Sequence, residues 1–361
     1  MTASIDASID ASVDASVVVR SYNRLPALCE LLTALLAQDA PGVGFEIIVV
    51  EQSTQPPPSD LAARLDELFA DPRVRVLRRP PLGGAGARNE GVRATTGRVV
   101  LFMDDDDLPG GPTWLVAHLR NFDDPDCLAV SGRHVVGGNE TRAPYRDMAK
   151  ARRQVMSFVP ILMWQRSWAR SDRRTQVESM IGGNSAVRRT AMERFGLWDE
   201  CTLIEDEHSF SYRVRAGKRA GEYMLFDPEP VMIRRFDVPG GMDKRRMTPR
   251  HLARRLFDFQ HDVLAHYFPV RFALLYPVYV ILAYVVAMDW VWNELSARGS
   301  WIRRLGASAR LAIELPFAWT AWLGRWAWRR VRHGPPVRRP RLVPLPAAGQ
   351  RFFHTGGRCA A

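Results

Sequence analysis

The sequence has few cysteines and nothing that resembles a targeting signal at its start. The four cysteines, Cys29, Cys127, Cys201 and Cys359, lie far apart and form no Cys-x-x-Cys pair. This spacing argues against a disulfide-rich secreted domain and against a structural zinc site, and it is typical of a reducing compartment. The first residues include neither a basic nor an apolar segment, so we expect no secretory signal peptide and a cytoplasmic protein.

The composition excludes several classes of protein and divides the chain into two regions. Hydrophobic residues make up 47% and charged residues 25% of the 361, which excludes a disordered, a collagenous and a polytopic membrane protein. From Arg234 to the end, 22 basic and 7 acidic residues give a balance of +15, whereas the first 233 residues carry 28 and 32, a balance of −4. Seven of the eleven tryptophans follow Asp289. This confined distribution favours a specialised last third over a nucleic-acid-binding protein.

Four segments follow from the pattern along the chain. Residues 2–16 repeat a short Ala-Ser-Ile/Val-Asp unit with little apolar surface, so we expect 1–15 to be a disordered leader. Residues 16–235 have the pattern of a globular α/β domain, and 236–334 that of a helical, basic and aromatic extension. The Arg- and Pro-rich residues 335–361 are expected to be a disordered tail.

Within the globular domain, short apolar runs alternate with helical patterns. This alternation predicts βαβ units and a mostly parallel sheet flanked by helices, in which ligands bind at the carboxyl ends of the strands. A glycine-rich turn is expected at 83–86, and the Arg-rich residues 133–174 are expected to form loops and helices over the sheet. The expected strands are 17–20, 45–50, 74–77 and 99–103, and the expected helices are 25–36, 61–69, 87–94 and 205–217.

Four consecutive aspartates directly follow the predicted strand 99–103. Their mutual repulsion is relieved by a divalent cation, and alternate residues of an extended strand end point the same way, so Asp104 and Asp106 are candidate ligands. The alternative is a solvated acidic turn that leads into a helix.

Two further segments are candidates for chemistry. The glycine-rich segment before Arg88 would let the backbone approach a phosphate that the guanidinium holds, although a simple structural turn is the alternative. Glu205 and Asp206 begin a predicted helix, where a carboxylate facing a cleft is a candidate general base. Stabilisation by the helix dipole is the other interpretation.

Six short motifs, in order, resemble those of the family 2 glycosyltransferases of the GT-A fold. The resemblance covers residues 16–235 and includes the Asp-x-Asp metal motif and the Glu-Asp motif that supplies the base. The matching segments are Ser21-Tyr22-Asn23, Glu51-Gln52-Ser53-Thr54, Ala87-Arg88-Asn89-Glu90-Gly91, Asp104-Asp105-Asp106, Gly182-Gly183-Asn184 through Gly196-Leu-Trp-Asp199-Glu200, and Glu205-Asp206.

This resemblance implies an inverting, metal-dependent transfer of a sugar from a nucleotide diphosphate to a hydroxyl group. It implies that Asp106, with Asp104, holds Mg²⁺ or Mn²⁺, and that Asp206 accepts the acceptor's proton. The residues implied for the donor nucleotide are Ser21, Asn23, Glu51, Arg88 and Asp104, and those implied for the acceptor side are Gly183, Asn184 and Glu205.

The sequence departs from the family at three positions. Glu51 and Gln52 replace paired aspartates that recognise the base, and Arg20 stands where the family has proline. The family often has a histidine after its last strand, whereas residues 231–234 contain none. If that histidine binds metal in relatives, coordination here is thinner or is completed by water.

The basic last third has the composition of a membrane-surface element. Phe272 to Met288 is an uncharged run of 17 residues, at the short limit for a bilayer span, with arginine on both sides. Further on, Leu315, Trp319, Trp322 and Trp326 follow helical spacing close to several arginines, as in an interfacial anchor. The alternatives are a helical appendage packed on the first domain and a basic patch for polyanions.

Together these features predict a glycosyltransferase at the inner face of the cytoplasmic membrane, peripheral or anchored. Its partners would be a nucleotide-sugar donor, a lipid-linked or saccharide acceptor and the membrane surface, in surface polysaccharide or glycolipid synthesis. Two alternatives stay open: a nucleotidyltransferase acting on a sugar phosphate, and a catalytically silent, membrane-bound protein that keeps the fold.

Overall fold

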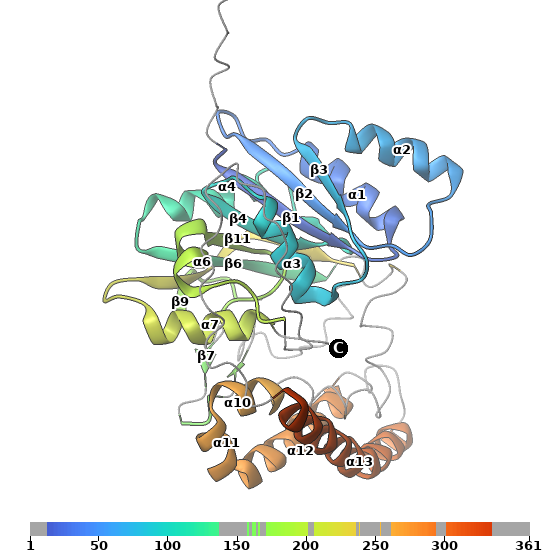
Figure 1. The fold of residues 1–361 in the computed structure, drawn as a ribbon, viewed down its shortest axis with the longest axis vertical. Helices are drawn as coiled ribbons and strands as arrows, with labels where there is room; N and C mark the ends of the chain where they lie inside the picture. Colours follow the sequence, from blue (N-terminus) through green and yellow to red (C-terminus); the bar gives the residue numbers. More distant parts are fainter. Residues whose placement is uncertain are drawn as a thin grey trace, which may run out of the picture.

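The computed structural model consists of a three-layer α/β domain and a layer of C-terminal helices (Figure 1). The expected leader and tail lie almost entirely outside the residues that the structure describes. The described residues are 13–136, 157–158, 161–163, 165–166, 171–200, 206–235, 238, 253, 261–293 and 301–333.

A mostly parallel sheet forms the centre of the domain, as the sequence predicts. Its order is β3-β2-β1-β4-β10-β6-β11-β5, with β9 paired to β11. Strands β10, β5 and β9 run against the direction of the other six. The strands are β1 (Ala15–Ser21), β2 (Phe45–Glu51), β3 (Val74–Arg78), β4 (Val99–Asp104), β5 (Asp107–Pro109), β6 (Cys127–Val136), β9 (Thr175–Val177), β10 (Ser185–Arg188) and β11 (Tyr223–Arg234).

Both faces of this sheet are buried, because alternate residues of its apolar strands point to opposite sides. In β1, Val17 and Val19 pack into one core cluster, whereas Val18 packs into the other. The first cluster is covered by α1 (Leu25–Leu36), α2 (Ser59–Phe69) and α4 (Trp114–Leu119), which continues as the short η1 (Arg120–Asp123). The second is covered by α3 (Gly83–Ala94), α6 (Arg189–Phe195) and α7 (Asp206–Gly217).

The predicted strands and helices are confirmed, with one difference at the glycine-rich segment. We expected a turn over 83–86, but α3 already begins at Gly83. A Cβ at Gly84 would clash with the guanidinium of Arg20. The glycines therefore allow the first turn of a helix to lie directly against an arginine of the neighbouring strand β1.

The Arg-rich stretch 133–174 is only partly described. Strand β6 extends into it, and β7 (Ser157–Phe158) pairs with β8 (Gln165–Arg166) in a short antiparallel ribbon. Residues 137–156 lie outside the described part, so the helices expected there stay a prediction.

The C-terminal helices that the structure describes form a separate layer below α7 (Figure 1). The layer has its own core cluster, which includes Phe272, Tyr279 and Trp322. Phe268 packs edge-on against Tyr212 of α7, and the Tyr279 hydroxyl donates to the Leu162 carbonyl at 2.6 Å. The helices are α10 (Asp262–Tyr267), α11 (Pro269–Leu274), α12 (Tyr276–Asn293) and α13 (Trp301–His333).

The tryptophan stripe of α13 faces inward. Leu315 and Trp322 are buried in the core of the layer, and Trp319 and Trp326 are half-buried against it. The prediction that this stripe contacts a membrane is therefore wrong, and it serves instead to pack the appendage. The uncharged run from Phe272 to Met288 is divided between α11 and α12, and of the helices that the structure describes, none has the length and apolar composition to cross a bilayer.

Candidate active site

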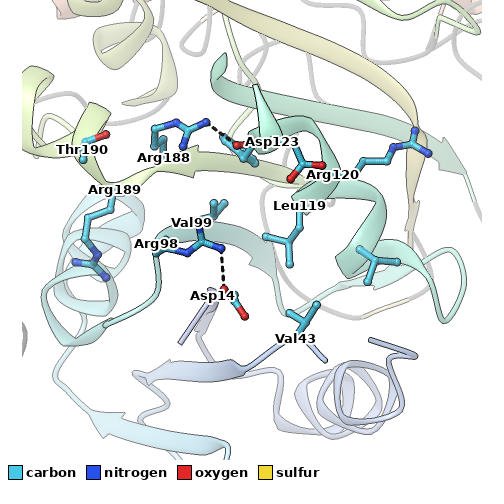
Figure 2. Close-up of a pocket in the computed structure, with 12 residues that line it drawn as sticks. Asp14, Val43, Arg98, Val99, Leu119, Arg120, Asp123, Arg188, Arg189 and Thr190 are labelled. Carbon is cyan, nitrogen blue, oxygen red and sulfur yellow. Dashed lines mark hydrogen bonds and ion pairs between the residues drawn. The ribbon is translucent and has the colours of Figure 1, made fainter. Parts of the chain in front are cut away.

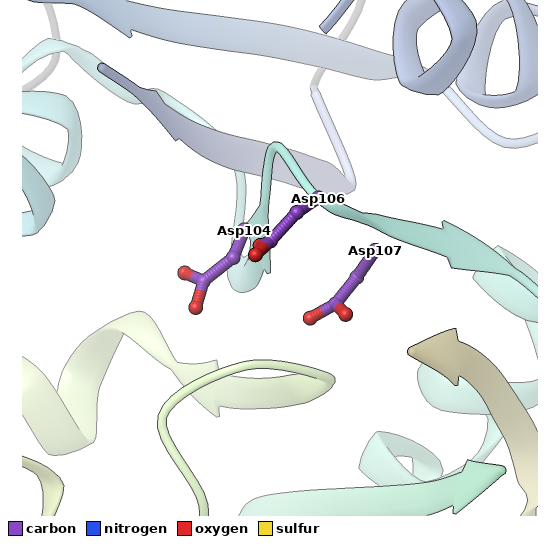
Figure 3. Close-up of side chains that lie close together, drawn as sticks. All are labelled: Asp104, Asp106 and Asp107. Atoms are coloured by element: carbon purple, nitrogen blue, oxygen red, sulfur yellow. The ribbon is translucent and has the colours of Figure 1, made fainter. Parts of the chain in front are cut away.

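The aspartate run forms the turn between β4 and β5 at the carboxyl edge of the sheet. Three of its carboxylates, those of Asp104, Asp106 and Asp107, each offer an oxygen within 4.8 Å of the others (Figure 3). The sequence predicted Asp104 and Asp106 as a pair and missed Asp107. This donor set fits a hard cation such as Mg²⁺ or Mn²⁺, which prefers carboxylate oxygens.

Gly183 lies next to the carboxylates of Asp104 and Asp107. A Cβ at this position would lie 3.7 Å from an oxygen of Asp107 and 3.8 Å from an oxygen of Asp104. The missing side chain leaves room beside the carboxylates. The structure thus brings together the predicted metal ligands and one predicted acceptor-side residue.

Four arginines from distant parts of the chain face the aspartates. Arg20 binds Asp104 through Nε at 2.6 Å and Nη2 at 2.8 Å, and Arg24 pairs with both Asp105 and Asp106. At the edges of the turn, Arg234 approaches Asp107 at 3.4 Å, and Arg88 lies 3.5 Å from Asp104. Four carboxylates and four guanidinium groups therefore nearly balance one another.

Burial acts to raise the pKa of three of these carboxylates, and the neighbouring arginines act to lower it. Burial alone would raise the pKa of Asp104, but Arg20, Arg88 and Arg234 hold it well below its usual range. For Asp107, burial outweighs Arg234 and raises the pKa to about 7. Burial likewise raises the pKa of Asp105 to about 6. Asp104 therefore stays ionised more firmly than Asp105 or Asp107.

Two departures from the family pattern thus contact the aspartate turn directly. Arg20, which stands where the resemblance leads one to expect proline, and Arg234, which ends the segment 231–234 that contains no histidine, each form the pair that strand register dictates. Arg20 lies opposite Asp104 in the β1–β4 pairing, and Arg234 lies opposite Asp107 in the β11–β5 pairing. The sequence marked Arg20 and the segment 231–234 as departures from the family, but it did not indicate which aspartates these arginines contact.

The residues predicted for the nucleotide border the same edge of the sheet. Ser21 is buried at the end of β1, and Glu51 ends β2, where its carboxylate accepts the backbone N–H of Ser53 at 2.6 Å. Asn23 has a positive φ of 54°, and its side-chain oxygen accepts the backbone N–H of Thr54 at 2.9 Å. These contacts join the loops that follow β1 and β2 into one rim.

Gln52, which replaces an aspartate of the family, has a structural contact of its own. Its side-chain oxygen accepts the backbone N–H of Leu82 at 2.8 Å, just before α3. On α3 itself, Asn89 binds the backbone of Trp198 through both ends of its amide, at 2.8 and 2.9 Å, and donates to Glu200 at 2.8 Å. The Ala-Arg-Asn element therefore anchors the Gly-x-x-Asp-Glu-like loop.

The start of α7 lies beside Arg88. A Cβ at Gly182 would lie 2.7 Å from Nη2 of Arg88 and 3.1 Å from a carboxylate oxygen of Glu207. Asp206 is the first residue of α7, its side chain lies outside the described part, and Glu205 lies outside it altogether. Gly182 lies beside Glu207 of α7, and Gly183 lies beside the carboxylate cluster. The helix predicted to carry the base therefore begins close to that cluster.

Asn184, predicted on the acceptor side, uses its side chain inside the protein. It is buried, its Nδ2 donates to the carbonyls of Pro230 and Arg133 at 2.9 and 3.1 Å, and its Oδ1 accepts from Trp114 at 2.6 Å. His118 Nε2 also lies 3.1 Å from Oδ1, and because burial lowers the pKa of His118 to about 4, the ring is neutral and donates from Nε2. Asn184 therefore positions the glycine segment rather than offering a free amide.

We expect Asn184→Ala to lower the free energy of unfolding by about 3 kcal/mol, because it leaves several buried polar groups without partners. Urea unfolding followed by circular dichroism measures this loss. The matched control is Asn23→Ala, which also removes an asparagine at positive φ but in an exposed turn, and we expect it to cost about 1 kcal/mol or less. Equal losses from the two variants would contradict the role assigned to Asn184.

A separate hollow of about 530 Å³ lies at the opposite, amino-terminal edge of the strands (Figure 2). Its lining includes Arg98, Arg188 and Asp14, and Arg98 already pairs with Asp14 at 2.7 Å. Arg188 donates to backbone carbonyls. None of the residues that line this hollow belongs to the carboxylate cluster. Asp14, Arg98 and Arg188 already have partners among the described residues.

Comparison with known proteins agrees with this geometry. The family described as glycosyl transferase family 2 matches residues 16–196. The probable glycosyltransferase YdaM of Bacillus subtilis is 25% identical over 196 residues, which cover 53% of this chain and 44% of the relative. The succinoglycan biosynthesis protein ExoO of Rhizobium meliloti is 34% identical over 91 residues, 25% of this chain and 24% of ExoO. The chain thus spans less than half the length of these relatives.

A solved structure shares the fold. The mannosyltransferase PcManGT from Pyrobaculum calidifontis, in complex with GDP-Man and Mn²⁺, superposes with a TM-score of 0.50 at 20% identity. The match covers 91% of this chain and 90% of PcManGT.

Proposed function

Because the chain belongs to glycosyl transferase family 2, we propose that it transfers a sugar from a nucleotide diphosphate donor to a hydroxyl group. The observation that carries the proposal is the cluster of Asp104, Asp106 and Asp107, which faces Gly183 at the carboxyl edge of the sheet. In α/β folds this edge is where ligands bind. Buried arginine and carboxylate groups there suit a charged donor.

The donor's diphosphate is proposed to bind between the aspartate turn and α3. Asp106, with Asp104, would hold Mg²⁺ or Mn²⁺, and Asp107 is a third candidate ligand. Such an ion, when bound, acts as a Lewis acid that neutralises charge on the leaving diphosphate. Arg88, which is buried beside Asp104, would direct its guanidinium fork at a phosphate oxygen.

Ser21, Asn23 and Glu51 are proposed to hold the nucleoside, because they form the rim next to this turn. The pairing of Asn23 with Thr54 keeps the rim in one shape before the ligand arrives. A rim formed in advance lowers the entropic cost of binding. The complex of PcManGT with GDP-Man and Mn²⁺ supports a donor of this general class.

Asp206 is proposed to be the general base. Its carboxylate would take the proton of the acceptor hydroxyl while that oxygen forms a bond to the anomeric carbon. The bond from the anomeric carbon to the diphosphate breaks on the opposite face, so the configuration inverts. Glu205, beside the base, and the Gly183–Asn184 segment are proposed to border the acceptor.

The acceptor is proposed to be a saccharide or a lipid-linked saccharide in polysaccharide or glycolipid synthesis. The match to ExoO, which is named for succinoglycan biosynthesis, supports this class of product. A saccharide acceptor offers several hydroxyl groups, so the residues beside Gly183 would select one of them.

Calorimetric titration with UDP, GDP and dTDP, each with and without Mn²⁺, tests the proposed function. We expect one nucleotide to bind only when the metal is present. Well-folded protein that binds none of them would favour the silent-fold alternative. Release of pyrophosphate from a nucleotide triphosphate and a sugar phosphate would favour the nucleotidyltransferase.

A further inference from the structure

The exposed apolar side chains of the described residues gather on the C-terminal helices. Fourteen large hydrophobic side chains are exposed, and twelve of them belong to α11, α12 and α13. Soluble surfaces rarely gather apolar side chains in this way, and such gatherings mark contact with a partner or a membrane. The twelve are Val270, Leu274, Val278, Ile281, Val285, Trp301, Ile302, Leu305, Ile313, Phe317, Trp328 and Val331.

Helix α13 is apolar on two opposite sides. Leu311, Leu315 and Trp322 are buried in the core of the layer. On the outer side, Ile313 is 64% and Phe317 is 68% exposed. Ile302, Ile313, Phe317 and Val331 are separated by 11, 4 and 14 residues, each close to a whole number of helical turns, so they lie in one line along the outside.

Helices α11 and α12 carry similar exposed side chains. Leu274 of α11 is 77% exposed and Ile281 of α12 is 62% exposed. Val278, Ile281 and Val285 follow helical spacing, so α12 also has an apolar outer side. We call the exposed apolar side chains of α11, α12 and α13 the outer apolar surface.

The charge of the same helices is almost entirely positive. The three helices contain eight arginines and two acidic residues, Asp289 and Glu314. The arginines are Arg271, Arg303, Arg304, Arg310, Arg325, Arg329, Arg330 and Arg332. An apolar helix face accompanied by arginine and tryptophan matches the boundary between anionic head groups and acyl chains.

We propose that the outer apolar surface lies on an anionic lipid membrane, with α12 and α13 in the plane of the interface. The ligand is the lipid surface and not a membrane span, because no described helix has the length and composition to cross. The charge favours lipid over a second copy of this chain, since two copies would bring two sets of arginines together. The sequence predicted a membrane contact through the tryptophan stripe of α13, whereas the outer apolar surface lies on the opposite side of that helix.

Contacts between α7 and the C-terminal helices link the outer apolar surface to the candidate active site. Arg213 of α7 donates to the Tyr267 hydroxyl of α10 at 2.7 Å, and Tyr212 packs edge-on against Phe268, with 5.0 Å between the ring centroids. Because α7 also begins with Asp206, one helix joins the lipid-binding layer to the proposed base. The membrane proposal itself stands without the proposed chemistry.

Sedimentation with lipid vesicles tests this surface. The full chain is mixed with vesicles of equal parts phosphatidylcholine and phosphatidylglycerol, and with vesicles of phosphatidylcholine alone. We expect at least about tenfold stronger partitioning onto the anionic vesicles, weakening as ionic strength rises. The double variant Ile313→Ser with Phe317→Ser should reduce this partitioning at least about tenfold, because two exposed apolar groups no longer enter the lipid.

The charge has its own matched pair of variants. Arg310→Glu on α13 should weaken binding to anionic vesicles several-fold, whereas Arg64→Glu, at another exposed arginine on α2, should leave it unchanged. Circular dichroism confirms that each variant is folded. Nucleotide binding is measured in a separate experiment. A lack of vesicle binding would therefore not argue against the proposed transfer reaction.

Two outcomes would overturn the proposal. One is wild-type protein that stays in solution with both kinds of vesicle. The other is a stable dimer in light scattering that the serine double variant converts to a monomer, which would assign the outer apolar surface to a second copy of the chain.

Discussion

Asp206→Asn is expected to lower kcat by about 10²- to 10⁴-fold while leaving nucleotide binding unchanged. Asparagine keeps the size of the side chain but cannot accept the acceptor's proton at neutral pH. Because Asp206 is the first residue of α7, the loss of its charge beside the helix dipole should cost less than about 1 kcal/mol of stability. Steady-state transfer rates, calorimetric nucleotide affinities and thermal unfolding separate these three effects.

The matched control for the base is Asp66→Asn, an exposed aspartate on α2 far along the chain from α7. It should leave kcat, nucleotide affinity and stability unchanged. Full activity of Asp206→Asn would remove this residue from the mechanism, and a nearby carboxylate such as Glu207 would then be the next candidate.

A second large effect is expected at the aspartate turn. Asp106→Asn should weaken metal-dependent nucleotide binding by about 100-fold, which corresponds to about 3 kcal/mol from the loss of one charged ligand. Asp106 is the clearest position for this test, because its side chain is 23% exposed, more than that of Asp104 or Asp107. Calorimetric titration in the presence and absence of Mn²⁺ measures the change.

The companion variants of this experiment separate binding from folding. Asp104→Asn would remove a carboxylate charge that both Arg20 and Arg88 contact, so it should lower the stability as well as the nucleotide affinity. Asp123→Asn, an exposed aspartate of η1, is the control that should change neither. Unaltered nucleotide affinity in Asp106→Asn would contradict the assignment of Asp106 as a metal ligand.

The sequence predicted the scaffold of the domain well, because local signals agreed there. Helix α1 has the bounds that its apolar spacing indicates, with a proline in its first turn. Strands β1, β2 and β4 follow runs of β-branched or apolar residues that only a sheet with two covered faces can bury. The Asp-x-Asp pair was found because it directly follows such a strand.

A local sequence pattern could not reveal which arginines pair with these aspartates. Arg20 and Asp104 are 84 residues apart, and Arg234 and Asp107 are 127 apart. Their pairing depends on which strands are neighbours and in which register. The antiparallel edge strand β5, which is three residues long, has no period that a sequence pattern can reveal.

Helix α13 shows a different limit of sequence reasoning. Its sequence contains two apolar lines, one through Leu315 and Trp322 and one through Ile313 and Phe317. Periodicity identifies both lines, but only packing decides which one turns inward. The line that contains Trp322 packs into the core with Phe272 and Tyr279, and the line through Ile313 and Phe317 remains outside.

The near balance of charge at the aspartate turn has a thermodynamic consequence for the order of events. Since Arg20, Arg24, Arg88 and Arg234 already face the four aspartates, the turn attracts a free divalent cation far less than four unpaired carboxylates would. A nucleotide diphosphate that engaged the arginines would release carboxylate oxygens. Each ligand would then raise the affinity for the other by the same factor, as reciprocal linkage requires. We therefore expect the cation and the donor to bind cooperatively.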